Sequence, residues 1–158
     1  MPSDIEITRR LHFSAGHRLL NHEGGCSHLH GHNYFAFITC KTAAELDSVG
    51  RVIDFAVVKQ RVGGWLDEKW DHGFILNSDD RAGREAMKAF DTFGGPSGLL
   101  TDTEQKLFLL PNMNPTAENM ASFLLRSVCP KVLHNTGVVT TAVRLEETEN
   151  CFAVATLY

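Results

Sequence analysis

The chain has 158 residues, of which 43% are hydrophobic and 22% are charged, and its formal net charge is -4. These values are typical of a soluble globular protein, so we expect a single domain over residues 1–158. The negative charge argues against a nucleic-acid partner, and the lack of an apolar leader or a run of roughly 18 apolar residues argues against secretion or a membrane partner.

The first half of the chain begins with two predicted strands. Apolar residues mostly alternate over residues 5–13, which indicates a half-buried strand. A Gly- and His-rich loop follows over residues 16–32. Residues 33–41 are rich in aromatic and β-branched side chains, which predicts a second strand.

A helix is predicted next, with Asp54 as its N-cap. Its apolar positions recur at helical spacing: Phe55, Val58, Val62, Trp65 and Leu66. The pair Gly63-Gly64 should weaken this helix or break it in two, because glycine is a poor helix former.

Residues 78–113 give weaker signals. RAGREAMKAF at 81–90 predicts a helix, GGPSG at 94–98 a turn, and KLFLL at 106–110 a short strand.

The last third of the chain predicts a helix and a hairpin. Asn114 or Thr116 is expected to open a helix over residues 117–128, with Pro115 near its first turn. Residues 138–145 and 151–158 are expected to form two strands joined through EETEN.

This order of elements, ββααββ, predicts an α+β fold. Paired strands with segregated helices favour a four-stranded antiparallel sheet with two main helices on one face. Such a sheet leaves two strand edges open, which favours edge pairing in an oligomer.

The strongest chemical signal is a cluster of histidines. Five of the eight histidines lie between residues 17 and 32, where random placement would put about one. They are His17, His22, His28, His30 and His32. If His30 and His32 begin the second strand, both project from the same face about 6.6 Å apart and can converge on one ion.

His17 closes the first predicted strand and could supply a third nitrogen if the two strands pair. Three nitrogens with an open position are the pattern of a catalytic zinc site. His22 and His28 are expected to be solvated loop residues.

Two further positions each allow two interpretations. Cys26 could be a fourth zinc ligand or a thiolate base near the metal. Asp71 and His72 could be a helix-terminal pair, or a carboxylate that orients a proton-relay histidine. The four cysteines are too few and scattered for a disulfide framework, which predicts a reducing, cytoplasmic location.

Six motifs occur in an order that is similar to a known family. They are FSAGH (13–17), C-x3-HGHNY (26–34), G-x-VIDF (50–55), WDHGFILN (70–77), NPTAEN (114–119) and LEETEN (145–150). Together they resemble the family of 6-pyruvoyltetrahydropterin and 6-carboxytetrahydropterin synthases. The resemblance covers nearly the whole chain outside 78–113, which looks like an insertion relative to shorter members.

The resemblance implies the site residues position by position. Three histidines match the zinc ligands of the family: His17, His30 and His32. Cys26 matches its general base, which removes the interpretation of Cys26 as a ligand. Asp71 and His72 match a relay pair that assists the base.

The resemblance also implies a pterin pocket. Glu147 matches a carboxylate that anchors the pterin ring and counts among the catalytic residues. Thr116 and Glu118 match residues that line the same pocket. The family fold is the tunnelling fold, in which subunits join their sheets into trimeric barrels that pair as homohexamers.

The implied substrate is a dihydropterin triphosphate, 7,8-dihydroneopterin triphosphate. The spacing between Cys26 and His30 is similar to the bacterial queuosine branch, which forms 6-carboxy-5,6,7,8-tetrahydropterin and releases acetaldehyde and triphosphate. The alternative within the family is 6-pyruvoyltetrahydropterin synthase, and the alternative of another class is a non-catalytic zinc- or pterin-binding protein. A zinc hydrolase is disfavoured because no HExxH motif is present. The sequence does not identify the basic residues that hold the triphosphate.

Overall fold

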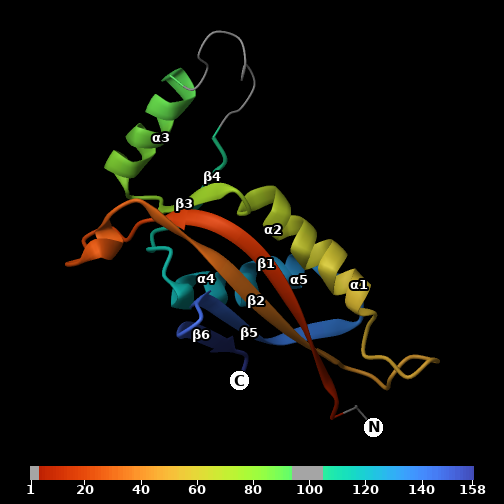
Figure 1. Cartoon of the computed structure of the whole chain (residues 1–158). Coiled ribbons are helices and arrows are strands. Elements are labelled where there is room, and N and C mark those ends of the chain that lie inside the picture. The colour runs from red at the N-terminus through yellow and green to blue at the C-terminus, as the bar shows by residue number, and fades with distance from the viewer. Residues whose placement is uncertain (1–3, 94–104) are drawn as a thin grey trace.

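A computed structural model describes residues 4–93 and 105–158 of the chain. Its centre is a sheet of six strands in the order β4-β3-β1-β2-β5-β6. The strands are β1 (Glu6–His17), β2 (His30–Thr42), β3 (Gly73–Asn77), β4 (Leu107–Leu110), β5 (Val138–Thr148) and β6 (Cys151–Thr156). Figure 1 shows the long curved strands β1 and β2 in front of α4 and α5, with α1 and α2 running beside β1.

Two helical segments cover one face of the sheet. The first comprises α1 (Phe55–Val58), the π-helical turn η2 (Lys59–Gly63) and α2 (Gly64–Lys69). The second comprises α4 (Ala117–Phe123), the π-helical turn η3 (Leu124–Val128) and α5 (Cys129–Val132). A 3-10 turn, η1 (Gly25–Ser27), lies in the loop between β1 and β2, and α3 (Arg81–Phe93) follows β3. No helix in the described ranges is long and apolar enough to cross a membrane.

The α+β class is confirmed, and so are the four predicted antiparallel strands. β1 pairs with β2 along its whole length, from Glu6↔Lys41 to His17↔His30, and β5 and β6 continue the antiparallel sheet. The alternation in β1 places Leu11, Phe13 and Ala15 in the core under the helices. Period-two alternation is therefore a reliable signal in this part of the chain.

The predicted strand number of four is wrong, because β3 and β4 extend the sheet. β3 runs parallel to β1 over three residue pairs, and β4 runs parallel to β3 over four. The apolar run FIL at 74–76 in β3 is short and continuous, and periodicity does not separate such a run from a buried helical turn.

The glycine pair at 63–64 does not end the first helical segment. The chain passes through it in a π-helical turn and continues as α2. A Cβ atom at Gly63 would lie 3.4 Å from Cδ2 of Leu11. The small residue therefore lets the helix approach β1 closely.

Both predicted helix starts are present, with one choice decided. The side chain of Asp54 accepts a hydrogen bond from the backbone N–H of Ala56. Thr116, not Asn114, caps α4, because its hydroxyl accepts from the N–H of Asn119 at 3.1 Å. Asn114 instead forms hydrogen bonds with the backbone of Leu20.

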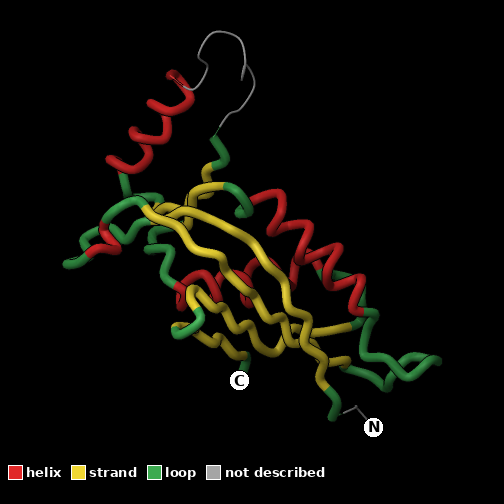
Figure 2. The backbone as a smooth tube through the Cα atoms, viewed as in Figure 1, coloured by secondary structure: helices red, strands yellow, loops and turns green. Residues whose placement is uncertain are grey.

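The predicted helix at 81–90 and the strand at 106–110 are both confirmed, as α3 and β4. The predicted turn at 94–98 lies outside the described residues. Figure 2 shows α3 projecting away from the two main helical segments, beyond the β3–β4 end of the sheet.

Candidate metal centre

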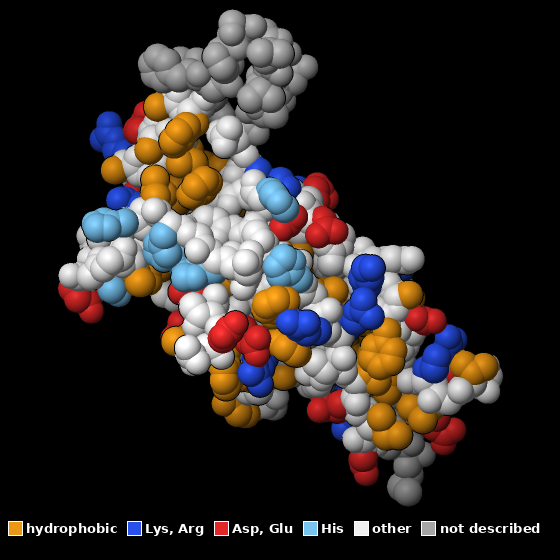
Figure 3. Space-filling model, viewed as in Figure 1, with side chains coloured by type: hydrophobic (Ala, Val, Ile, Leu, Met, Phe, Trp, Pro, Cys, Tyr) orange, Lys and Arg blue, Asp and Glu red, His pale blue; other side chains and the backbone are white. Residues whose placement is uncertain are grey.

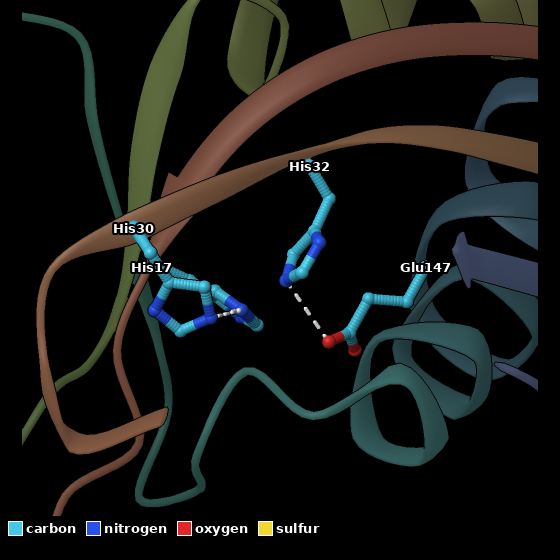
Figure 4. Close-up of side chains that lie close together, drawn as sticks. All are labelled: His17, His30, His32 and Glu147. Carbon is cyan, nitrogen blue, oxygen red and sulfur yellow. Dashed lines mark hydrogen bonds and ion pairs between the residues drawn. The ribbon is translucent and has the colours of Figure 1, made fainter. Parts of the chain in front are cut away.

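The pairing of β1 with β2 brings the three predicted ligands together. His17 lies directly opposite His30, and His32 lies two residues further along β2, opposite Ala15. The three rings therefore share the helix-covered face of the sheet. Their centroids are 4.6 Å (His17–His30), 5.0 Å (His30–His32) and 5.1 Å (His17–His32) apart, and Figure 4 shows them side by side.

Backbone carbonyls fix the tautomers of two of these rings. Nδ1 of His17 lies 2.8 Å from the carbonyl oxygen of Pro115, and Nδ1 of His30 lies 2.7 Å from that of His28. A carbonyl only accepts, so each Nδ1 is the donor and each Nε2 carries a lone pair in the neutral ring. The two Nε2 atoms face one another at 3.0 Å. A bound cation would turn this repulsion between lone pairs into shared coordination.

Glu147 supplies a fourth donor from a distant part of the chain. A register shift between Glu146 and Thr148 interrupts the β5–β6 pairing at this residue. Its Oε1 lies 3.0 Å from Nε2 of His32, and Figure 4 shows the carboxylate turned toward that ring. Nε2 of His32 is nevertheless buried without a hydrogen bond of acceptable geometry. It is a polar atom that a metal ion would satisfy.

The electrostatics of the cluster favour neutral imidazoles. Burial, with the charges of His30 and His32, lowers the pKa of His17 to about 4 against the opposing effect of the Pro115 carbonyl. Burial also lowers the pKa of His32, although Glu147 acts in the other direction. Neutral imidazole is the form that binds a metal.

The residues present fit a metal ion. One donor atom from each of His17, His30, His32 and Glu147 lies within 4.8 Å of all the others. Imidazole nitrogens with a carboxylate are a donor set used by zinc. Each of the two tautomer-fixing carbonyls is an outer partner of the kind that orients metal ligands.

Tyr34 packs against the histidine cluster. It lies on β2 two residues after His32, and its hydroxyl is 3.2 Å from Nδ1 of His17. Burial first, and then the charges of Glu147 and Cys26, raise the pKa of its phenol. Neither Tyr34 nor Pro115 was predicted as a site residue, although the strand period puts Tyr34 on the same face as His32 and the NPTAEN motif contains Pro115.

Cys26 lies in η1, within the loop that joins the two histidine-bearing strands. It is half-buried and free, and its carbonyl accepts from the backbone N–H of Leu19 at 2.8 Å. This hydrogen bond joins the two ends of the loop. Figure 3 shows histidine side chains gathered at the end of the molecule that carries this loop.

Asp71 and His72 form the predicted pair. Oδ2 of Asp71 lies 2.6 Å from Nδ1 of His72, and its Oδ1 accepts from the N–H of Ser14 at 2.8 Å. His72 has a positive φ of 57°, which is uncommon for a residue other than glycine. The turn therefore presents the imidazole outward, with 82% of its side chain exposed.

The structure does not place His72 among the three clustered histidines of its own chain. His72 lines a pocket with Ser14 and Asn33, whose side chains lie on the sheet face opposite the metal cluster, and His32 is among the other residues that line it. Ser14 Oγ donates to Asn33 Oδ1 at 2.7 Å across this face.

The two remaining predicted residues lie at the start of α4. Thr116 is next to Pro115, whose carbonyl holds His17, but its hydroxyl is used as the helix cap. Glu118 is exposed in the first turn of α4. His28 is exposed and His22 half-buried in the loop, where Nδ1 of His22 accepts from Gly24 N–H at 2.9 Å.

The fold and site together define an α+β protein with a histidine cluster able to hold a metal ion. Comparison with known proteins gives the family. Residues 6–157 match the family described as 6-pyruvoyl tetrahydropterin synthase. The chain belongs to this family.

Relatives with assigned names include 6-carboxy-5,6,7,8-tetrahydropterin synthases. That of Rickettsia bellii is 38% identical over 94% of this chain and 97% of its own length. That of Haemophilus influenzae is 28% identical over 94% of this chain and 96% of its own.

Solved structures confirm the fold. An uncharacterised protein of Wolinella succinogenes has a TM-score of 0.77 at 23% identity, covering 96% of this chain and 97% of its own. The 6-pyruvoyl tetrahydropterin synthase of Caenorhabditis elegans has a TM-score of 0.65 at 23% identity, covering 98% of this chain and 96% of its own.

Proposed function

We propose that this chain is a zinc-dependent 6-carboxy-5,6,7,8-tetrahydropterin synthase. The reaction converts 7,8-dihydroneopterin triphosphate and water into 6-carboxytetrahydropterin, acetaldehyde and triphosphate. The ring is reduced while the side chain is oxidised and cleaved, so no external redox cofactor is needed. The observation that carries the proposal is the convergence of His17, His30 and His32 with Glu147, in a chain whose relatives of similar length bear this name.

The three histidines would hold the metal through their Nε2 atoms. Bound zinc would supply Lewis acidity to the oxygens of the substrate side chain. The chain itself contributes the neutral ligand form and the carbonyl contacts that aim His17 and His30.

Cys26 and Glu147 would act on the substrate directly. We assign Cys26 as the base that takes a proton from the side chain, because it is a free, half-buried thiol in the loop that joins the two histidine-bearing strands. Glu147 suits the guanidine-like edge of a pterin, since a carboxylate can accept two parallel hydrogen bonds. Thr116 and Glu118 would line the same pocket from α4.

We further propose the homohexamer, a dimer of trimers, as the working assembly. β1 pairs with β3 only over residues 15–17, so most of its outer edge lacks a strand partner within the described ranges. β6 ends the sheet on the other side. These open edges could join between copies, and the exposed His72, with Asp71 behind it, would then be available to a neighbouring copy as the proton relay.

The test of the reaction is product analysis. Zinc-loaded protein is incubated with 7,8-dihydroneopterin triphosphate, and the products are identified by mass spectrometry. We expect 6-carboxytetrahydropterin with acetaldehyde in equal amount. A 6-pyruvoyl product would assign the other branch of the family, and absence of turnover would favour a binding protein.

The assembly is tested by mass and by complementation. Light scattering should give six times the mass of the chain. Cys26→Ala and His72→Ala, each inactive alone, should regain partial activity after mixed refolding if copies share sites. No recovery in verified mixed oligomers would contradict the sharing.

A further inference from the structure

Outside the proposed ligands and bases, Arg18 and Asp80 form a close ion pair. Nε of Arg18 lies 2.5 Å from Oδ2 of Asp80, and Nη2 lies 2.6 Å from Oδ1. This is a two-bond fork, the geometry in which guanidinium and carboxylate fix each other's orientation. The side chain of Asp80 is 1% exposed and that of Arg18 is 24% exposed.

The carboxylate of Asp80 is itself held at the start of α3. Its Oδ1 accepts from the backbone N–H of Gly83 at 2.9 Å. A Cβ atom at Gly83 would lie only 2.6 Å from Oδ2 of Asp80. The absence of a side chain at residue 83 therefore lets the helix close over the carboxylate.

Arg18 touches both sides of the loop that carries Cys26. It follows His17 directly, and its Nη1 donates to the carbonyl of Ser27 at 3.5 Å. The neighbouring N–H of Leu19 donates to the carbonyl of Cys26 at 2.8 Å. The guanidinium of Arg18 thus lies where the two ends of the loop meet, and it contacts Ser27, the residue after Cys26.

Asn114 holds the same loop from the other end of the segment between β3 and α4. Its Oδ1 accepts from the N–H of Leu20 at 2.8 Å, and its Nδ2 donates to the carbonyl of Leu20 at 2.9 Å. Asn77, at the end of β3, donates to the same Oδ1 at 3.4 Å. Asp80, near the start of the 78–113 segment, and Asn114, just beyond its end, therefore both contact the loop that carries Cys26.

We propose that Asp80 is a positioning residue that acts through Arg18 to hold the Cys26 loop, residues 18–28, in its working geometry. The start of the 78–113 segment, where Asp80 and Gly83 lie, is then a support of the catalytic apparatus and not only part of an insertion. The catalytic meaning rests on the proposed role of Cys26, whereas the mechanical coupling between Asp80 and the loop does not.

The first test is Asp80→Asn, with Asp79→Asn as the matched control. Asp79 is adjacent and exposed, so its substitution removes the same charge without touching Arg18. In Asp80→Asn we expect faster amide exchange across residues 18–28 and faster alkylation of Cys26 by iodoacetamide, mapped by peptide mass. We expect kcat to fall about 10- to 100-fold with KM and zinc content unchanged. Asp79→Asn should behave as wild type.

Several results would overturn the proposal. One is loop exchange and alkylation in Asp80→Asn equal to those of Asp79→Asn. Another is loss of zinc in parallel with activity, which would place the effect on His17. The loop measurements need no turnover, so an inactive wild-type protein would refute the proposed function and leave the positioning test intact.

If Asp80→Asn does not fold, Arg18→Lys replaces it. Lysine keeps the charge but lacks the fork, so it cannot hold Asp80 and Ser27 together. We expect the loop to loosen in the same sense, and an unchanged loop in a folded Arg18→Lys variant would refute the proposal.

Discussion

The β1–β2 ribbon and the segment between β3 and α4 both position candidate catalytic groups, but through different interactions. In the ribbon, backbone register places His17 opposite His30 and puts His32 on the same face. In the segment, side chains reach across to a loop: Asp80 to Arg18, and Asn114 to Leu20. The ribbon places its histidines through backbone pairing, whereas each support in the segment depends on a single side chain.

This difference predicts two kinds of mutant. Substitution of a ligand in the ribbon removes chemistry outright while the strands remain paired. Substitution of a supporting side chain, such as Asp80, leaves the catalytic groups present but shifts their positions. The variants below separate these two outcomes, beginning with the largest expected effect.

His30→Ala should abolish metal binding and activity together. The ring supplies one of the three imidazoles, and its loss leaves a gap in the donor set that no other residue of the described cluster is positioned to fill. Metal content by plasma mass spectrometry should fall to background. His28→Ala is the control. The side chain of His28 is exposed, and its contact with His30 is made by the backbone carbonyl, which alanine retains. A full metal complement in His30→Ala would remove this residue from the ligand set.

Cys26→Ala should keep the metal and lose turnover. We expect kcat to fall by about 1,000-fold or more, the upper part of the range for removing a general base. Cys151→Ala is the control, since Cys151 is also free but exposed at the start of β6. Metal loss in Cys26→Ala would show instead that the thiol is a ligand.

The two regions also differed in how far the sequence could predict them. Alternation predicted the strand at 5–13, aromatic and β-branched content predicted the strand at 33–41, and the strand period then placed His30 and His32 on one face. Neither signal reports which strands lie side by side, so β3 and the parallel pairing of β3 and β4 with the sheet were missed, although the strand at 106–110 was predicted. Glu147 was expected at the pterin, and its 3.0 Å approach to His32 depends on an irregularity in β5 that no spacing reveals.

The contacts that support the loop could not be predicted from the sequence, for a related reason. Arg18 and Asp80 are far apart in the chain, and a single arginine or aspartate carries no periodic signal. Only the tertiary structure brings Asp80 under the guanidinium and Asn114 beside Leu20. The same holds for His72, whose motif predicted a partner in Asp71 but not the sheet face on which the pair lies.

Lys106→Met tests a support of the Asp71–His72 turn. Nζ of Lys106 donates to the carbonyls of Asp67 at 2.8 Å and Asp71 at 2.6 Å, at the end of α2. Loss of these charge-assisted bonds should lower the free energy of unfolding by about 2 kcal/mol. Urea denaturation measures this difference. Lys69→Met removes a charge from the same helix end and should change stability by less than about 0.5 kcal/mol.

The smallest expected effect is the pH dependence of the Arg18–Asp80 pair. Hydrogen bonding to Arg18 holds the pKa of Asp80 below its ordinary value of 3.8. A lowered pKa in the folded state stabilises the protein above the unfolded value, and this contribution is lost as the pH falls through the folded pKa. Asparagine keeps an acceptor but not the charge, so Asp80→Asn should cost only about 1 kcal/mol at neutral pH.

The difference in unfolding free energy between wild type and Asp80→Asn should therefore narrow as the pH falls below 3.8. Denaturant titrations across this range measure it, with Asp79→Asn as the reference for a general charge effect. A difference that stays constant below 3.8 would mean that the charge on Asp80 contributes nothing and that its packing alone matters. A modest stability loss combined with a large fall in kcat would distinguish a residue that positions a catalytic loop from one that merely holds the fold together.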